Sequence, residues 1–263
     1  MFELIPTTFS KLRDHRRAYL KTTVVPLDGM WETAFFPAAK HWVIQSDDEM
    51  IGYCAIDEAN ALVGFQVFSP DRAEAAFEYC LEALGLSEAF VSTAEPNYLS
   101  LCMDHQTKVT VNALMFEDAG REATQAAFPN GSEFRKVTQA EFNIAIDFGL
   151  HSIGDRRDWL EGYYAERIQK EELFGLWNGR ELRAAGELRI SPIQDGIADV
   201  GMVVSPEFRK LGIATLILKQ LRYEGQQRGL RLICSTEERN IGARKAIHRA
   251  GFVSTQRILK IIF

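Results

Sequence analysis

The sequence A-D-V-G-M-V-V-S-P-E-F-R-K-L-G-I-A-T-L-I-L-K-Q-L, residues 198–221, contains a strand, a loop and a helix in succession. The apolar run 200–204 predicts a buried strand, and Ser205-Pro206 ends it. From Ile213 onward the apolar residues recur at helical spacing. The basic loop 209–212 is therefore expected at the first turn of a helix, where unpaired N–H groups and the positive end of the dipole suit phosphate oxygens.

A second strand and helix follow. Gly229 predicts the end of the first helix, and residues 230–234 form another apolar run. Asn240 and Gly251 stand at the start and just past the end of a second helical segment. Because Gly212 leaves the backbone bare for close approach, the loop is interpreted as a diphosphate site, with a plain strand-to-helix turn as the alternative.

Both segments resemble the GNAT superfamily of acyl-CoA N-acyltransferases. R-K-L-G-I-A, residues 209–214, is similar to the [Q/R]-x-x-G-x-[G/A] signature of that superfamily. Asn240-x-x-Ala243, followed by Gly251-Phe252, is similar to its second cofactor segment. The resemblance covers residues 132–263. It implies acetyl-CoA as co-substrate and transfer of the acetyl group to an amine, and it does not imply a particular acceptor.

The resemblance also implies a set of cofactor-binding residues. The strand before the loop would splay from its neighbour, so that the backbone of Val203 and Val204 could bind the pantetheine arm. The loop amides would hold the diphosphate, and Arg209 could pair with a phosphate or be a solvated loop residue. The implied residues are Val203, Val204, Arg209, Lys210, Leu211, Gly212, Ile213, Ala214, Thr215, Asn240 and Ala243, with Arg244 as a further candidate.

Acetylation of an amine needs a base, because an alkylamine with a pKa of about 10 is protonated at neutral pH. Asp199 lies in the strand where the superfamily often places its base, and Glu187 is a second carboxylate on the preceding strand. Each could instead be an ordinary strand residue. Many relatives carry an acid tyrosine where this chain has Ile247, which cannot donate a proton. Tyr163 and Tyr164 are other candidate donors, or aromatic residues that pack a helix.

The N-terminal half repeats the C-terminal half. F-E-L-I-P-T-T at Phe2 parallels F-R-K-V-T-Q at Phe134, and A-L-V-G-F-Q-V-F-S-P at Ala61 parallels A-D-V-G-M-V-V-S-P at Ala198. The first copy passes from S-P-D-R, residues 69–72, directly into its helix and lacks the R-x-x-G-x-A loop.

Because phosphate affinity depends on that helix turn, this repeat predicts an unequal tandem protein. Residues 1–130 are expected to form a degenerate GNAT-like domain and residues 131–263 an acetyl-CoA-binding one, joined by the polar stretch 117–131. The expected fold class is α/β (α+β), each domain a mixed, mostly antiparallel sheet flanked by helices.

The composition of the chain indicates which classes of binding partner are not expected. A net charge of −6 over 263 residues, without a visible basic face, argues against nucleic acid. No apolar stretch approaches bilayer length and no leader is visible, so we expect a cytoplasmic protein without a membrane partner. The cysteines lack C-x-x-C spacing, which predicts buried thiols and no metal site.

Three functions are compatible with these observations. The first is an N-acetyltransferase that acts on a primary amine of a small molecule, or less readily on a peptide, as a monomer or homodimer. The second is a non-catalytic acyl-CoA-binding module. The third is an unrelated α/β protein.

Overall fold

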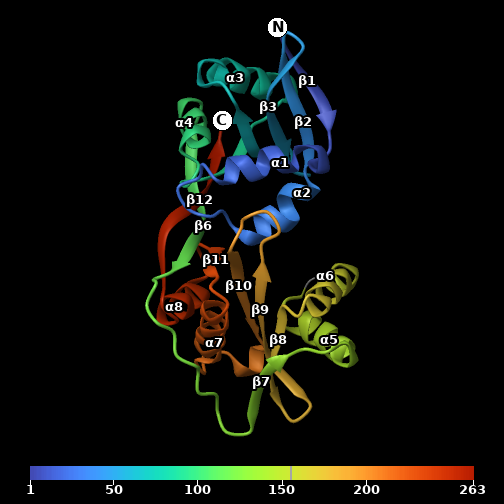
Figure 1. The fold of residues 1–263 in the computed structure, drawn as a ribbon, viewed down its shortest axis with the longest axis vertical. Helices are drawn as coiled ribbons and strands as arrows, with labels where there is room; N and C mark the ends of the chain where they lie inside the picture. Colours follow the sequence, from blue (N-terminus) through green and yellow to red (C-terminus); the bar gives the residue numbers. More distant parts are fainter. Residues whose placement is uncertain (155) are drawn as a thin grey trace. The chain divides into compact units, whose positions relative to one another are not determined.

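Each half of the chain contains one pair of parallel strands, Leu62–Val67 with Glu88–Ser92 in the first half and Ile197–Val204 with Arg231–Glu237 in the second. Figure 1 shows the fold. The computed structural model describes residues 1–154 and 156–263, which form two compact units. The first unit contains Met1–Met115, Pro192–Gln194 and Ser254–Phe263, and the second contains Phe116–Ser191 and Asp195–Val253. In each unit the remaining strand pairs are antiparallel wherever their register is given, so the predicted mixed, mostly antiparallel sheets are confirmed.

The first unit is a sheet with strand order β1-β2-β3-β4-β5-β12 and helices on both faces. Its strands are β1 (Phe2–Thr7), β2 (Lys40–Ser46), β3 (Glu49–Ile56), β4 (Leu62–Val67), β5 (Glu88–Ser92), most of β6 (Lys108–Asp118) and most of β12 (Phe252–Ile262). Its helices are α1 (Phe9–Leu20), α2 (Phe36–Ala38), α3 (Ala73–Leu84) and α4 (Pro96–Asp104). The helix that follows residues 69–72 begins as a 3-10 turn, Pro70–Arg72, and α3 is followed by Gly85, whose φ is 60°.

The second unit repeats this order of elements, and its strands follow the order β11-β10-β9-β8-β7. The strands are β7 (Ser132–Lys136), β8 (Leu173–Asn178), β9 (Glu181–Ile190), β10 (Ile197–Val204) and β11 (Arg231–Glu237). The helices are α5 (Phe142–Ser152), α6 (Arg157–Gln169), α7 (Ile213–Gln227) and α8 (Ile241–Arg249). Helices α5 and α6 cover one face of the sheet, and α7 packs against the other (Figure 1). On that second face, Ile217 of α7 lies against the backbone at Gly186.

The compact units differ from the sequence halves at their terminal strands. The end of β12 pairs antiparallel with β5, from Ile258 opposite Ser92 to Ile262 opposite Glu88, and therefore belongs to the first unit. The last residues of β6, from Phe116, belong to the second unit, where β6 neighbours β11. The compact units therefore do not divide at the repeat boundary predicted after residue 130: most of β12, the final strand of the second repeat, belongs to the first unit, and the last residues of β6, the final strand of the first repeat, belong to the second.

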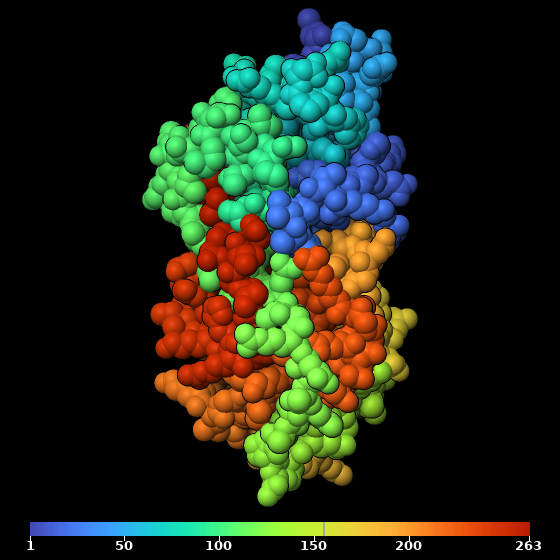
Figure 2. All heavy atoms as spheres, turned by 60° about the vertical axis from the view of Figure 1, so that its left-hand side comes forward, coloured from blue at the N-terminus to red at the C-terminus, as the bar shows by residue number. Residues whose placement is uncertain are grey.

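The polar connection 117–131 is attached to the second unit by hydrogen bonds to α7. Arg222 Nε donates to Asp118 Oδ1 at 2.6 Å, and the amide of Ala126 donates to Gln220 Oε1 at 2.9 Å. Figure 2 shows this segment, in green, running over the surface beside orange and red residues of the second unit. The connection therefore lies along α7 in an extended form, without helix or strand from residue 119 to residue 131.

All four cysteines are buried free thiols, as predicted. In the part of the chain that the structure describes, each helix is too short or too polar to cross a bilayer.

Candidate functional site

Strands β10 and β11 part halfway along their length. They pair in parallel from Ile197 opposite Arg231 to Asp199 opposite Ile233. Beyond that point β10 continues to Val204 with β9 as its paired neighbour, and β11 continues to Glu237. The predicted splay is therefore present, and it leaves one side of residues 200–204 without a strand partner among the described residues.

We call the side of residues 200–204 that has no strand partner in the described part of the chain the opening. Successive residues of β10 direct their backbone N–H and C=O groups alternately toward β9 and toward this opening. Ile197 O accepts from Ser191 N and Ser205 N donates to Arg183 O, so the odd-numbered residues point their backbone groups toward β9. The backbone of Val203 is therefore directed toward β9. Met202 and Val204 point theirs toward the opening. The sequence prediction named Val203 and Val204 and did not include Met202, because the direction of each backbone group cannot be read from the sequence without the strand register.

The loop between β10 and α7 forms a concave set of amides. Gly212 is the N-cap of the fifteen-residue α7, with a φ of 81°, and Lys210 also has a left-handed φ of 65°. No atom lies within 4 Å of the place where a Cβ on Gly212 would be, so the cap faces open space. Among the described residues, the amides from Lys210 to Ala214 have no hydrogen-bond acceptor. Alternating left-handed residues at a helix N-terminus form an anion-binding nest, which fits the diphosphate predicted here.

The side chain of Arg209, at the start of this loop, forms two hydrogen bonds to backbone carbonyl oxygens. Its Nε donates to Val204 O and its Nη2 to Ser152 O, both at 3.0 Å. Arg209 thereby ties the end of β10 to the end of α5, and this bonding occupies two of its donor groups. The neighbouring Leu211 is 67% exposed, and Thr215 N donates to Gly212 O at 3.0 Å in the first turn of α7.

The second predicted cofactor segment begins α8. Asn240 is its N-cap, and Asn240 Oδ1 accepts from Ala243 N at 3.1 Å, so both predicted residues take part in the cap. Arg244 donates to Glu238 O at 2.9 Å. Ile247 is 2% exposed and lies in the core, which is consistent with an apolar residue at the position of the missing tyrosine.

The two predicted carboxylates meet at one arginine that the sequence analysis did not single out. Arg189 Nη2 lies 2.8 Å from Asp199 Oδ2, and Arg189 Nη1 forms an ion pair with Glu187 Oε2. All three side chains are nearly buried, and they share one face of the sheet because Arg189 is directly opposite Asp199 in the β9–β10 ladder. Tyr163 of α6 donates to Glu187 Oε2 and accepts from Arg189 Nη1 at 2.9 Å. We call Tyr163, Glu187, Arg189 and Asp199 the carboxylate cluster.

The space left by Gly201 and the charges of the two carboxylates both determine how Arg189 is accommodated in the carboxylate cluster. A Cβ on Gly201 would lie 3.2 Å from Arg189 Nη1, so the glycine leaves room for the guanidinium. Burial alone would lower the pKa of Arg189, but the charges of Asp199 and Glu187 outweigh burial and raise it well above the usual value. The cluster therefore holds two carboxylates and one permanently charged guanidinium, an arrangement that favours a cationic guest.

The two tyrosines considered from sequence differ in their surroundings. Burial, followed by the charge of Glu187, raises the pKa of Tyr163, so its hydroxyl keeps its proton and remains a donor. The ring of Trp159 stacks on Tyr163 with centroids 4.8 Å apart, and Trp159 is 42% exposed. Tyr164 is buried, and its hydroxyl has no hydrogen-bond partner among the described residues. The structure thus joins Tyr163, not Tyr164, to the predicted carboxylates.

The β4–β5 pair and the turn into α3 of the first unit differ from the β10–β11 pair and the nest of the second unit. In the first unit, the parallel strands β4 and β5 have a register at Leu62 opposite Ala89, and Leu62 O accepts a hydrogen bond from the buried Tyr98 of α4 at 3.1 Å. The repeat aligns Tyr98 with Ile241, which is 59% exposed in the second unit. The first unit also goes from β4 to α3 through the short turn at Pro70–Arg72 in place of a nest.

Comparisons with known proteins identify the family of both halves of the chain. Residues 8–119 match the family described as "Acetyltransferase (GNAT) domain", and residues 139–252 match "Acetyltransferase (GNAT) family". A GNAT family acetyltransferase from Colwellia psychrerythraea is 32% identical, with a TM-score of 0.91 over 100% of this chain and 99% of the other. A search of functionally curated proteins gives no match.

Two more distant structures share the fold. A tandem GNAT protein from the clavulanic acid biosynthesis pathway is 13% identical, with a TM-score of 0.71 over 99% of this chain and 97% of the other. A GCN5-related N-acetyltransferase from Sphaerobacter thermophilus is 14% identical, with a TM-score of 0.68 over 98% and 94% of the two chains. With two matched domains in one chain and a full-length relative at 32% identity, the chain belongs to the GNAT acetyltransferase family, in its tandem form, and is an acyl-CoA-dependent N-acyltransferase.

Proposed function

We propose that this protein transfers the acetyl group of acetyl-CoA to a primary amine of a small molecule, and that the second unit carries out the reaction. The observation that carries the proposal is the nest of free amides at the start of α7, at the end of a strand that has lost its neighbour. The first unit has a short 3-10 turn at this place, and Tyr98 donates to Leu62 O, at the residue where its parallel strands pair.

The residues present fit coenzyme A. The amides from Lys210 to Ala214 would hold the diphosphate, and the backbone of Met202 and Val204 would hydrogen-bond the pantetheine arm as a strand would. Val203, whose backbone points toward β9, would contribute its side chain to the coenzyme A site in place of its backbone. Asn240 would orient the start of α8 through its cap to Ala243.

Acetyl-CoA supplies a thioester whose carbonyl carbon accepts the amine nitrogen. For that nitrogen to attack, the ammonium group must first give up a proton, and Glu187 or Asp199 would accept it. Arg189 forms an ion pair with each carboxylate, and Tyr163 fixes Glu187 by hydrogen bonding. The new C–N bond forms as the C–S bond breaks, and the second proton that leaves the nitrogen goes to the departing thiolate. The first proton, held by the carboxylate, is released to solvent.

The proposal is tested by measuring acetyl-CoA binding calorimetrically and release of free thiol in the presence of a panel of small amines and peptides. Gly212→Asp should abolish binding, because it adds a negative charge and a strained φ at the nest. Gly179→Asp is the matched control, since Gly179 also has a positive φ, of 59°, with no atom within 4 Å of its Cβ position.

Retained binding in Gly212→Asp would remove the nest from the proposal. Binding without thiol release for any amine would favour the non-catalytic module. Thiol release with peptides alone would replace the small-molecule acceptor.

A further inference from the structure

Trp159 of α6 is an exposed aromatic residue beside the carboxylate cluster. It comes four residues before Tyr163, so the two side chains are neighbours on the helix surface. The indole stacks on the Tyr163 ring, with the planes 10° apart, and 42% of Trp159 stays exposed. Tyr163 Oη in turn donates to Glu187 Oε2 at 2.5 Å. One ring contact and one hydrogen bond therefore separate the exposed indole from a proposed base.

Other sides of Tyr163 are occupied by the protein itself. Tyr164 is buried in the core beneath α6. Toward the end of the helix, Arg167 is 7% exposed and pairs with Glu172 at 2.6 Å and with Glu166 at 2.5 Å. Its guanidinium carbon lies 5.5 Å from the centroid of the Tyr163 ring. Core packing and ion pairs thus take up these sides, so an acceptor that follows α6 to the cluster meets the side nearer the start of the helix.

Gly162 keeps the surface next to Trp159 uncovered. It comes three residues after Trp159, in the interior of α6, where a glycine costs about 1 kcal/mol relative to alanine. Among the described residues, no atom lies within 4 Å of the place where its Cβ would be. We call the exposed part of the Trp159 side chain, with the bare backbone of Gly162, the indole face.

The described charged residues that precede and flank Trp159 in sequence are paired with carboxylates or guanidinium groups of the protein. Arg156 forms an ion pair with Asp158, and Arg157 Nη2 lies 3.2 Å from Asp147 Oδ1. A second charge on a ligand would lose water here without gaining a dedicated partner, which is unfavourable. The indole face therefore suits an apolar group.

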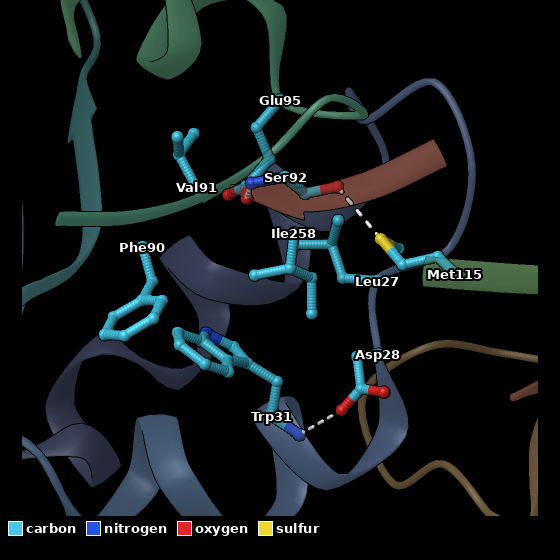
Figure 3. Close-up of a pocket in the computed structure, with 9 residues that line it drawn as sticks. All are labelled: Leu27, Asp28, Trp31, Phe90, Val91, Ser92, Glu95, Met115 and Ile258. Carbon is cyan, nitrogen blue, oxygen red and sulfur yellow. Dashed lines mark hydrogen bonds between the residues drawn. The ribbon is translucent and has the colours of Figure 1, made fainter. Parts of the chain in front are cut away.

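A tryptophan of the first unit shows the contrast. Trp31 lines a pocket together with Phe90, and the two rings pack edge to face with centroids 5.9 Å apart (Figure 3). Trp31 Nε1 also donates to Val63 O at 3.4 Å. The first unit thus encloses the Trp31 indole with its own residues, whereas Trp159 keeps much of its surface for another molecule.

We propose that Trp159 determines acceptor specificity, and that the acceptor is a primary amine with an apolar carbon skeleton. This inference rests on the acetyl transfer proposed above. The amine nitrogen binds at the carboxylates while the apolar part of the molecule covers the indole face. Each Å² of apolar surface removed from water contributes about 25 cal/mol, and an aromatic group also gains from packing on the indole. An amine too short to reach Trp159 gains neither.

The test compares methylamine, hexylamine and phenylbutylamine as acceptors, by release of free thiol from acetyl-CoA. For the wild type, we expect kcat/KM to be at least about tenfold higher for phenylbutylamine than for methylamine. Trp159→Ala should remove this preference and leave kcat/KM for methylamine within about twofold of wild type, because methylamine does not reach the indole. Trp159→Phe should keep most of the preference. Trp159→Gln, with a good helix former, repeats the test if Trp159→Ala does not fold.

Phe68→Ala is the matched control. Phe68 is 43% exposed and its ring stacks on His15 with centroids 5.2 Å apart, so the variant removes an aromatic residue of similar exposure from the first unit. It should keep the wild-type preference among the amines.

A second measurement reads binding without chemistry. Calorimetric titration of phenylbutylamine into the full chain with coenzyme A, which carries no acetyl group, should give saturable binding that Trp159→Ala weakens at least about fivefold. Binding that depends on Trp159 without thiol release would support this inference and contradict acetyl transfer. Thiol release with equal kcat/KM for all three amines would leave acetyl transfer standing and overturn this inference.

Three further results would overturn it. One is an equal loss of kcat/KM for methylamine and phenylbutylamine in Trp159→Ala, which would mean that the indole only holds Tyr163 in place. Another is a preference for hexane-1,6-diamine over hexylamine, which would place a charged group at the indole face. The last is absence of phenylbutylamine binding to the wild type.

Discussion

Arg189 lies directly opposite Asp199 in the β9–β10 ladder, with Nη2 of the arginine 2.8 Å from Oδ2 of the aspartate. The same guanidinium binds Glu187, two residues earlier on β9. One arginine therefore holds both carboxylates that the sequence nominated as bases. This contact makes the carboxylate cluster a single electrostatic unit rather than two independent candidates.

The first prediction concerns that unit. Arg189→Met should lower the free energy of unfolding by about 3 kcal/mol, because it leaves two carboxylates buried without their counter-charge. Arg156→Met is the control, since Arg156 pairs with Asp158 at a site where its side chain is 80% exposed. Urea denaturation followed by circular dichroism measures both, and equal stability of the two variants would contradict the prediction.

Tyr163→Phe removes a hydroxyl that donates to Glu187 and accepts from Arg189. We expect kcat to fall about tenfold, because Glu187 loses the hydrogen bond that positions it. The KM for acetyl-CoA should stay unchanged. Tyr164→Phe is the neighbouring control and should behave as wild type, since the Tyr164 hydroxyl has no partner among the described residues. Steady-state kinetics across pH distinguishes them.

Coenzyme A should bind once per chain. The second unit has the nest, whereas in the first unit Tyr98 donates to Leu62 O and α3 starts without a glycine loop. Tyr98→Ala should therefore destabilise the first unit without creating a second site, because the diphosphate would still lack its amides. Calorimetric stoichiometry checks this expectation, and two equivalents bound per wild-type chain would contradict it.

A pH-dependent contribution to stability is expected from Glu141. Its carboxylate pairs with Arg135, caps the turn that begins at Thr138, and has a pKa lowered to about 2, first by the hydrogen bond from Arg135. A lowered pKa in the folded state stabilises the protein above the unfolded pKa of about 4.5 and loses that effect as the pH falls toward 2.

Glu141→Gln should thus cost about 1 kcal/mol at pH 7, a value limited by solvent screening, and nearly nothing at pH 2. Glu133→Gln is the control, because Glu133 pairs with the same Arg135 at 3.3 Å but is 69% exposed. Urea unfolding of the wild type and both variants at several pH values gives the comparison. A Glu141→Gln deficit that is constant with pH would rule out the linkage.

The turns, the helix caps and the internal repeat of this protein could be predicted from its sequence. Gly212 lies at the start of α7 as its place before a helical pattern suggested, Asn240 caps α8, and Gly229 and Gly251 follow the ends of their helices. These features depend on residues a few positions apart, so turn and cap preferences reveal them directly. The repeat and the missing loop of the first copy are likewise properties of the letters themselves.

Tertiary structure decided the rest, because it depends on contacts between residues distant in sequence. Strand register directs the backbone of Met202 and Val204 toward the opening, and it brings Arg189 onto Asp199. Packing of α6 against the sheet adds Tyr163 to the same cluster. The final strand pairs with β5 of the other repeat, a choice between two similar partners that hydrophobic patterning within either half cannot make.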